Sequence, residues 1–127
     1  AALTEVSGSS EVFVGSINTY ANEWKEKQLG VSAETLETVG AVSEECALAM
    51  VEGLCQRYSS NVGIAVTGIA GPGGGTVEKP VGLVYIGISI LGQVSIFEHK
   101  FRGLRKDVRQ QTVTYALNHL RLLLKDR

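Results

Sequence analysis

Little in this sequence of 127 residues supports cross-linking, membrane insertion or charge-driven binding. Its only cysteines, Cys46 and Cys55, lie nine residues apart in a predicted helix, about half a turn from each other, so we expect neither a disulfide nor a shared metal ion. No apolar run approaches the roughly 20 residues of a membrane helix. The net charge of −1 excludes a general attraction to nucleic acid or to an anionic membrane.

No charged stretch followed by an apolar core opens the chain, so we expect no signal peptide. Two thiols in such a chain are typical of a reducing compartment, and we therefore expect a cytoplasmic protein. Hydrophobic residues make up 44% of the sequence and charged residues 20%, which is ordinary for a soluble globular protein. The length predicts one domain.

Helical and strand patterns alternate along the chain. Residues 11–20 and 61–68 are typical of strands, and residues 81–101 predict two strands joined near 91–93. Helices are expected within 21–30, 31–40, 43–58 and 102–125, with Ser32 and Ser43 as N-caps. The apolar stripe of the last helix is expected to contain Val113, Leu117, Leu120 and Leu124. The alternation predicts an α/β fold, a three-layer α/β/α sandwich with a mixed β-sheet.

The stretch TGIAGPGGGTVEKPVG, residues 67–82, follows a predicted buried strand. Ligands of open α/β sheets bind at that end of a strand, and backbone N–H groups of glycines form anion-binding nests. A Walker loop is excluded because no Gly-Lys-Ser/Thr opens a helix, and a dinucleotide fingerprint because no helix follows the glycines. The stretch is either a structural turn or a ligand site. Two prolines stiffen it and Lys79 is nearby, which favours the ligand site.

Five stretches of the chain together resemble the CinA C-terminal domain family, the nicotinamide-nucleotide amidases. They are the glycine loop, LTEVSGSSEVF, TYANEWKEKQLGV, GAVSEECALAM and FRGLRKDVR. The resemblance implies a single amidase domain over residues 1–127. It also implies hydrolysis of the carboxamide of nicotinamide mononucleotide to nicotinic acid mononucleotide and ammonia, in pyridine nucleotide salvage. The implied mechanism is of the Ser–Lys type and uses no metal and no cofactor.

The nucleophile implied by the resemblance is the serine of a Glu-Ser-Cys-Thr-Gly-Gly motif, which opens a helix ahead of Ala1 and is absent from these 127 residues. Either the chain is trimmed or the protein has lost its nucleophile. The sequence begins as if within a helix, which favours trimming. We therefore expect the chain as given to be inactive.

The resemblance assigns catalysis to Tyr20 and Lys25, with Lys25 as the base. By pattern alone Lys25 is a solvated helix lysine and Tyr20 a packed tyrosine. The two side chains can converge only across a break between a strand ending at Tyr20 and a helix starting near Asn22. A lysine acts as a base where burial or a nearby cation favours its neutral form.

The resemblance places the ribose phosphate of the substrate, and one possible source of an oxyanion hole, at the glycine loop and at two arginines. Arg105 and Arg109 share a helix face, which by pattern alone is a solvated one. His99 is expected to be a surface residue of a strand. The full set of expected substrate-binding residues is Thr67, Gly68, Gly71, Gly73, Gly74, Gly75, Lys79, Arg105 and Arg109.

Two other functions compete with the amidase. The same pocket without a nucleophile is a nucleotide-binding module, and the family's competence-associated name suggests an interaction protein. The expected partner is the small-molecule substrate, with no direct contact to nucleic acid and no membrane. The long strands and the leucine-rich last helix favour a homo-oligomer.

Overall fold

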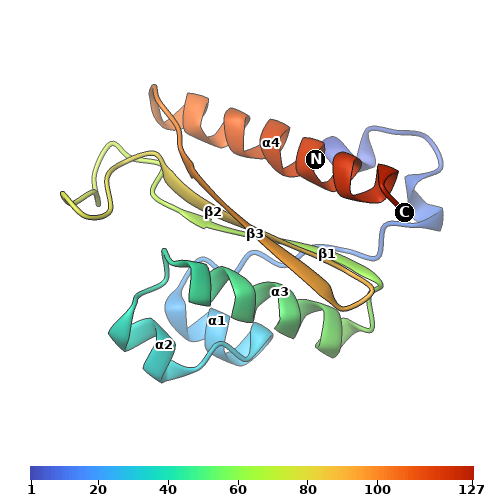
Figure 1. The fold of residues 1–127 in the computed structure, drawn as a ribbon, viewed down its shortest axis with the longest axis horizontal. Helices are drawn as coiled ribbons and strands as arrows, with labels where there is room; N and C mark the ends of the chain where they lie inside the picture. Colours follow the sequence, from blue (N-terminus) through green and yellow to red (C-terminus); the bar gives the residue numbers. More distant parts are fainter.

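The computed structural model describes all 127 residues and has three layers, with a sheet between helices on both of its faces (Figure 1). Two short 3₁₀ turns, Ala2–Thr4 and Ser9–Glu11, open the chain. The α/β class and the helices on both faces are confirmed. The helices are α1 (Asn22–Leu29), α2 (Ala33–Thr38), α3 (Glu44–Tyr58) and α4 (Arg105–Lys125), and the strands are β1 (Val62–Gly68), β2 (Leu83–Ile90) and β3 (Gln93–Lys100).

The sheet differs from the expected mixed sheet because its three strands, in the order β1-β2-β3, are all antiparallel. Residues 11–20, expected as a further strand, have no strand assignment, although their composition is β-branched. Val12 and Val14 are exposed to solvent. A strand needs a partner for its backbone groups, and composition alone does not supply one. β1 and β3 are therefore the edges of the sheet.

The predicted turn near residues 91–93 is confirmed, since β2 and β3 form a hairpin in which Ile90 pairs with Gln93. Leu91 and Gly92 make the turn with φ of 50° and 85°. Two successive positive φ values are typical of the type I′ turn, whose twist matches that of the flanking strands. Glycine adopts this conformation without strain, whereas leucine does so rarely.

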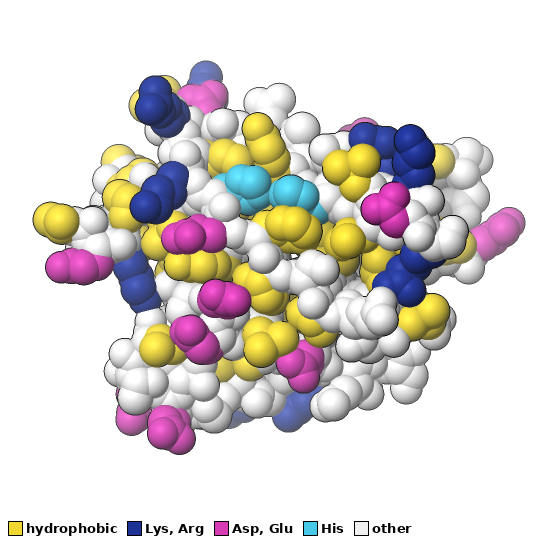
Figure 2. Space-filling view, in the orientation of Figure 1, with side chains coloured by type: hydrophobic (Ala, Val, Ile, Leu, Met, Phe, Trp, Pro, Cys, Tyr) yellow, Lys and Arg dark blue, Asp and Glu magenta, His cyan; other side chains and the backbone are white.

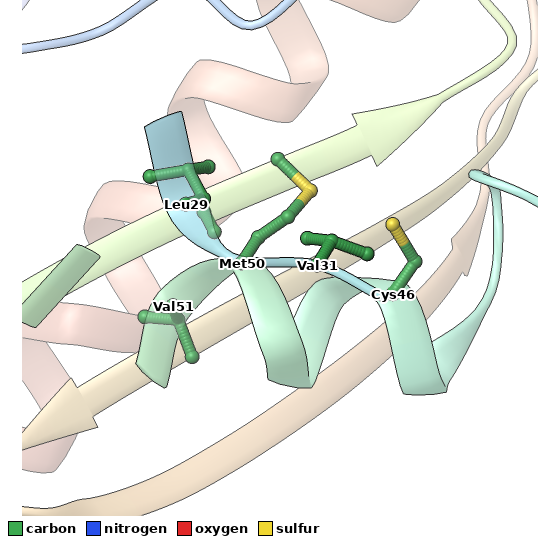
Figure 3. Packing of buried hydrophobic residues seen from close by; sticks show 6 residues of the cluster. Leu29, Val31, Cys46, Met50 and Val51 are labelled. Carbon is green, nitrogen blue, oxygen red and sulfur yellow. The ribbon is translucent and has the colours of Figure 1, made fainter. Parts of the chain in front are cut away.

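One face of the sheet packs against α3. The helix can come close to the strands because two strand positions that face it are glycines without a side chain. A Cβ on Gly63 would lie 2.5 Å from the Sγ of Cys55, and one on Gly87 would lie 3.0 Å from the carbonyl oxygen of Ala47. The core on this face consists of Leu29, Val31, Cys46, Met50, Val51 and Ala65. Figure 3 shows residues from the end of α1 and the chain after it against the apolar side of α3. The predicted N-cap Ser43 accepts a hydrogen bond from the Cys46 N–H at 3.1 Å.

The opposite face packs against α4, whose buried residues are Val108 and Ala116. The predicted stripe was partly wrong, because Val113 is 48% exposed and Leu124 45% exposed. Leu120 does pack against the core, together with Leu123. The α4 core consists of Val84, Ile86, Ile88, Ile90, Val108 and Ala116. No helix of the structure combines the length and the apolar character needed to cross a bilayer.

Candidate active site

Lys25 is the buried cation of the structure, with 7% of its surface exposed. It lies on α1, directly after the chain changes from extended backbone at Ala21 to helix at Asn22. Its amino group donates hydrogen bonds to the carbonyl oxygen of Thr19 at 2.8 Å and to that of Tyr20 at 3.4 Å. The predicted break between an extended segment and a helix is therefore present, and it turns Lys25 back toward the segment before α1.

Tyr20 approaches Lys25 through its backbone carbonyl, whereas its side chain is 82% exposed. The sequence expectation was that the side chains of the two residues converge. In this structure the phenol instead extends into solvent, because Ala21 is extended and Tyr20 precedes the helix. The contact that the structure supplies is a carbonyl oxygen, which orients the amino group of Lys25.

Thr67 lies buried near the end of β1, on the α3 face of the sheet. Its hydroxyl donates a hydrogen bond to the carbonyl oxygen of Ala41 at 2.7 Å. Lys79, from the glycine loop, donates from its amino group to the carbonyl oxygen of Val39. The two bonds tie the end of β1 and the glycine loop to the turn between α2 and α3, and so fix the position of the loop relative to the start of α3.

Cys46 lies beside the two lysines, although the sequence predicted of it only that it forms no disulfide and shares no metal ion with Cys55. It is fully buried in the first turn of α3. Burial raises the pKa of its thiol, while the positive charges of Lys25 and Lys79 act in the opposite direction. The two lysines, 54 positions apart in sequence, are therefore close enough to act on one thiol. The only feature of the sequence that could have indicated this location of Cys46 is its position three residues after the N-cap Ser43.

The glycine loop has a defined conformation, as its two prolines predicted. The N–H of Gly82 donates to the carbonyl oxygen of Ile69 at 2.7 Å and closes the base of the loop. At its tip, the N–H of Thr76 donates to the carbonyl oxygen of Lys79 at 2.8 Å. Gly71 and Gly74 have φ of 84° and 88°, which glycine adopts freely.

Gly73 and Gly75, also expected to bind substrate, differ in their surroundings. Nothing lies within 4 Å of a Cβ placed on Gly73, so its backbone is open to solvent. A Cβ on Gly75 would lie 2.7 Å from the backbone nitrogen of Val81, so Gly75 serves close packing within the loop. Gly71, Gly74 and Gly75 therefore determine the conformation of the loop, whereas Gly73 leaves open space next to its backbone.

The two arginines at the start of α4 lie on the side of the glycine loop that is away from α3 and Lys25. The guanidinium of Arg105 donates a hydrogen bond to the carbonyl oxygen of Gly71 at 2.9 Å. Arg109 lines a cavity of about 580 Å³ together with Gly68, Val84 and Lys106, a lysine that the sequence expectation missed. The cavity lies between the end of β1 and the first turns of α4.

The end of β1 separates two groups of predicted residues, because successive side chains of a strand point to opposite faces. Thr67 lies on the α3 face with Lys25 and Lys79, whereas Gly68 lies on the α4 face with the two arginines. Each group contains two cationic side chains, Lys25 and Lys79 on one face and Arg105 and Arg109 on the other, so the site suits an anionic ligand. No group of three metal-ligating side chains gathers anywhere in the structure.

The chain is similar to known proteins of one family. The family model described as the CinA C-terminal domain matches residues 1–124. A CinA-like protein of Fusobacterium nucleatum is 52% identical over 97% of this chain. The crystal structure of the competence/damage inducible protein CihA from Agrobacterium tumefaciens is 47% identical, with a TM-score of 0.93 over 96% of this chain and 75% of that one.

A CinA superfamily protein from Escherichia coli is 34% identical, with a TM-score of 0.92, over 96% of this chain and 71% of the solved one. The chain spans 30% of the length of the Fusobacterium relative. The similarity therefore concerns one domain of that longer protein, and the resemblance drawn from five sequence stretches is confirmed.

Proposed function

The chain belongs to the CinA C-terminal domain family, and from that membership we propose that it is an amidase domain acting on nicotinamide mononucleotide. The reaction hydrolyses the carboxamide to a carboxylate and releases ammonia. We place it in pyridine nucleotide salvage, in the cytoplasm. The proposal goes beyond the names of the relatives, which refer to competence and damage.

The observation that carries the proposal is the setting of Lys25. A buried amino group whose two hydrogen bonds go to backbone carbonyls has a fixed direction and no carboxylate partner among its hydrogen bonds. Lysines on helix surfaces are normally solvated, so burial of this one needs a reason. Service as the general base of a Ser–Lys pair is such a reason.

In the proposed reaction the amino group of Lys25 takes the hydroxyl proton of a serine as the serine oxygen attacks the carboxamide carbon. The C–N bond then breaks, and the proton passes from Lys25 to the leaving nitrogen, which departs as ammonia. Water hydrolyses the resulting ester, gives the carboxylic acid product and restores the serine. The serine is the one that the family resemblance implies ahead of Ala1.

The anionic end of the substrate is assigned to the glycine loop and its basic neighbours. Phosphate is recognised by guanidinium groups and by backbone N–H groups of glycine-rich turns. Arg105 bonds the loop at Gly71, and Arg109 lines the cavity beside Gly68. Lys79 lies on the face of Lys25 and places a further positive charge near the reacting end.

The test is an assay of ammonia release from nicotinamide mononucleotide. It compares residues 1–127 with a longer polypeptide that includes the Glu-Ser-Cys-Thr-Gly-Gly motif upstream. We expect release by the longer polypeptide and loss of release when the motif serine is changed to alanine. Binding of the mononucleotide without any ammonia release by the longer polypeptide would contradict the amidase.

A second function requires that the full protein has no serine beside Lys25, and residues 1–127 supply none. The amino group of Lys25 bonds no serine hydroxyl, and the buried serine of this region, Ser43, is engaged as the N-cap of α3. The domain would then bind a nucleotide without hydrolysing it, as a sensor or a competence-associated interaction module. Nucleotide binding with no turnover in the longer polypeptide is the result that this alternative requires.

A further inference from the structure

The two histidines of the chain meet at the junction of β3 and α4. His99 lies on β3 and His119 on α4, and their Nε2 atoms are 2.8 Å apart. Figure 2 shows the two imidazoles side by side at the surface, in cyan, among hydrophobic side chains. Both are half-buried, so the expectation that His99 is a simple surface residue was incomplete. The pair lies outside the candidate active site.

Aromatic rings hold both imidazoles in place. His119 stacks on Phe97 with ring centroids 3.8 Å apart, and His99 stacks on Phe101 with centroids 5.0 Å apart. Tyr115 is tilted against His99 at 4.8 Å. Rings fixed by stacking lose little further freedom when a ligand binds, so the pair is pre-organised.

Both imidazoles favour the neutral form. Burial lowers the pKa of His99, and burial together with the charge of His99 lowers the pKa of His119. Neutral imidazole nitrogen is a common ligand of transition metals in proteins. Within the pair one Nε2–H donates to the other Nε2 atom, so the two rings are different tautomers.

We propose that His99 and His119 form a chelating site for a divalent transition metal ion that prefers right-angled coordination, such as Ni²⁺ or Cu²⁺. With metal–nitrogen bonds of about 2.0–2.1 Å, nitrogens separated by 2.8 Å subtend roughly 85° at the metal. That angle matches neighbouring positions of a square-planar or octahedral complex. Tetrahedral Zn²⁺ would need the nitrogens roughly 3.3 Å apart.

Metal binding requires one change of tautomer and a rotation of each ring within its own plane, because in the hydrogen-bonded pair the two Nε2 atoms are directed at each other rather than at a shared ion. The imidazole that donates from Nε2 transfers that proton to its own Nδ1, through water, so that both Nε2 lone pairs face the ion and no net proton is released. Because no third metal-ligating side chain is grouped with the pair, water fills the remaining positions. A bound ion would join the edge strand β3 to the C-terminal helix α4 and would stabilise the folded state by linkage.

The experiment is a titration of the untagged, chelator-treated chain with NiCl₂, followed by isothermal calorimetry. We expect one Ni²⁺ per chain, a rise in melting temperature on adding Ni²⁺, and weaker binding of Zn²⁺ than of Ni²⁺. His119→Phe keeps an aromatic ring against Phe97 but removes a ligand, and we expect it to weaken Ni²⁺ binding at least tenfold. Tyr115→Phe, the matched control, should keep the affinity within twofold.

His99→Phe provides a second, independent variant in case His119→Phe does not fold, which circular dichroism would reveal. No detectable Ni²⁺ binding by the wild-type chain would overturn the proposal. So would unchanged affinity in a folded variant of either histidine. Tighter binding of Zn²⁺ than of Ni²⁺ would overturn the right-angled geometry.

Discussion

The guanidinium of Arg105 donates a hydrogen bond to the carbonyl oxygen of Gly71, 34 residues earlier in the chain, at 2.9 Å. This bond joins the first turn of α4 to the middle of the glycine loop. A side chain that the sequence predicts as a phosphate ligand therefore also positions the loop. Under the proposed function, substrate binding and loop geometry would be coupled through this one residue.

Arg105→Lys should weaken binding of nicotinamide mononucleotide about tenfold, which corresponds to roughly 1.4 kcal/mol. Lysine keeps the charge but lacks the planar fork that can bond a carbonyl and a phosphate together. Calorimetric titration of the mononucleotide measures the effect. Arg102→Lys is the control, since the Arg102 side chain makes no hydrogen bond in the structure, and its affinity should be unchanged. Equal affinities for both variants would remove Arg105 from the binding site.

Lys25→Met should abolish ammonia release in the polypeptide that carries the upstream serine, and should spare substrate binding. The methionine fills the buried volume without an amino group to accept the proton. Single-turnover kinetics and a separate binding measurement distinguish the two effects. Lys27→Met, on the exposed side of the same helix, is expected to leave turnover intact. Undiminished turnover in Lys25→Met would show that another group is the base.

Gly53→Ala should destabilise the fold by roughly 2–3 kcal/mol. A Cβ at this position of α3 would lie 1.7 Å from the carbonyl oxygen of Leu29, so α1 and α3 would have to separate. The intrinsic preference of helices for alanine, about 1 kcal/mol, acts against this loss but is smaller. Urea denaturation gives the change in the free energy of unfolding.

The matched control for this prediction is Gly73→Ala, where a Cβ meets no atom within 4 Å. Its free energy of unfolding should stay within about 0.5 kcal/mol of the wild type. A Gly53→Ala variant as stable as Gly73→Ala would contradict the close approach of α3 to the Leu29 carbonyl.

The histidine pair makes stability depend on pH below the ordinary imidazole pKa of 6.5. Folding lowers the pKa of both imidazoles, so between the folded values and 6.5 the unfolded chain binds more protons. The free energy of unfolding should therefore fall as pH decreases through this window and should level off above it. Urea denaturation at several pH values measures the slope, which His119→Phe should reduce. A slope unaffected by this substitution would contradict the assignment to the pair.

Helix caps and tight turns could be predicted from the sequence, because each depends only on residues that are close together in the chain. Ser32 and Ser43 cap their helices as expected, because a cap needs only the N–H groups of the next turn. The turn at Leu91 and Gly92 was likewise predicted from residues on either side of it. Cys46 and Cys55 are free thiols, as their spacing indicated.

Features that depend on distant parts of the chain were not predictable in this way. The segment 11–20 has the composition of a strand but no partner in the sheet, and the exposure of Val113 depends on where α4 crosses the strands. The convergence of Lys25 with Lys79 on Cys46, and of His99 with His119, joins residues from different elements. The family resemblance singled out Lys25, which the structure shows to be buried, because a family pattern carries such tertiary information and composition does not.

The sheet of only three strands leaves the outer backbone groups of β1 without strand partners along Val62–Gly68. Val66, at this edge, is 40% exposed. Such an edge is a template on which another extended chain can continue the sheet. We therefore expect concentrated solutions of the isolated chain to polymerise edge to edge, and expect a lysine placed on this strand to reduce that association.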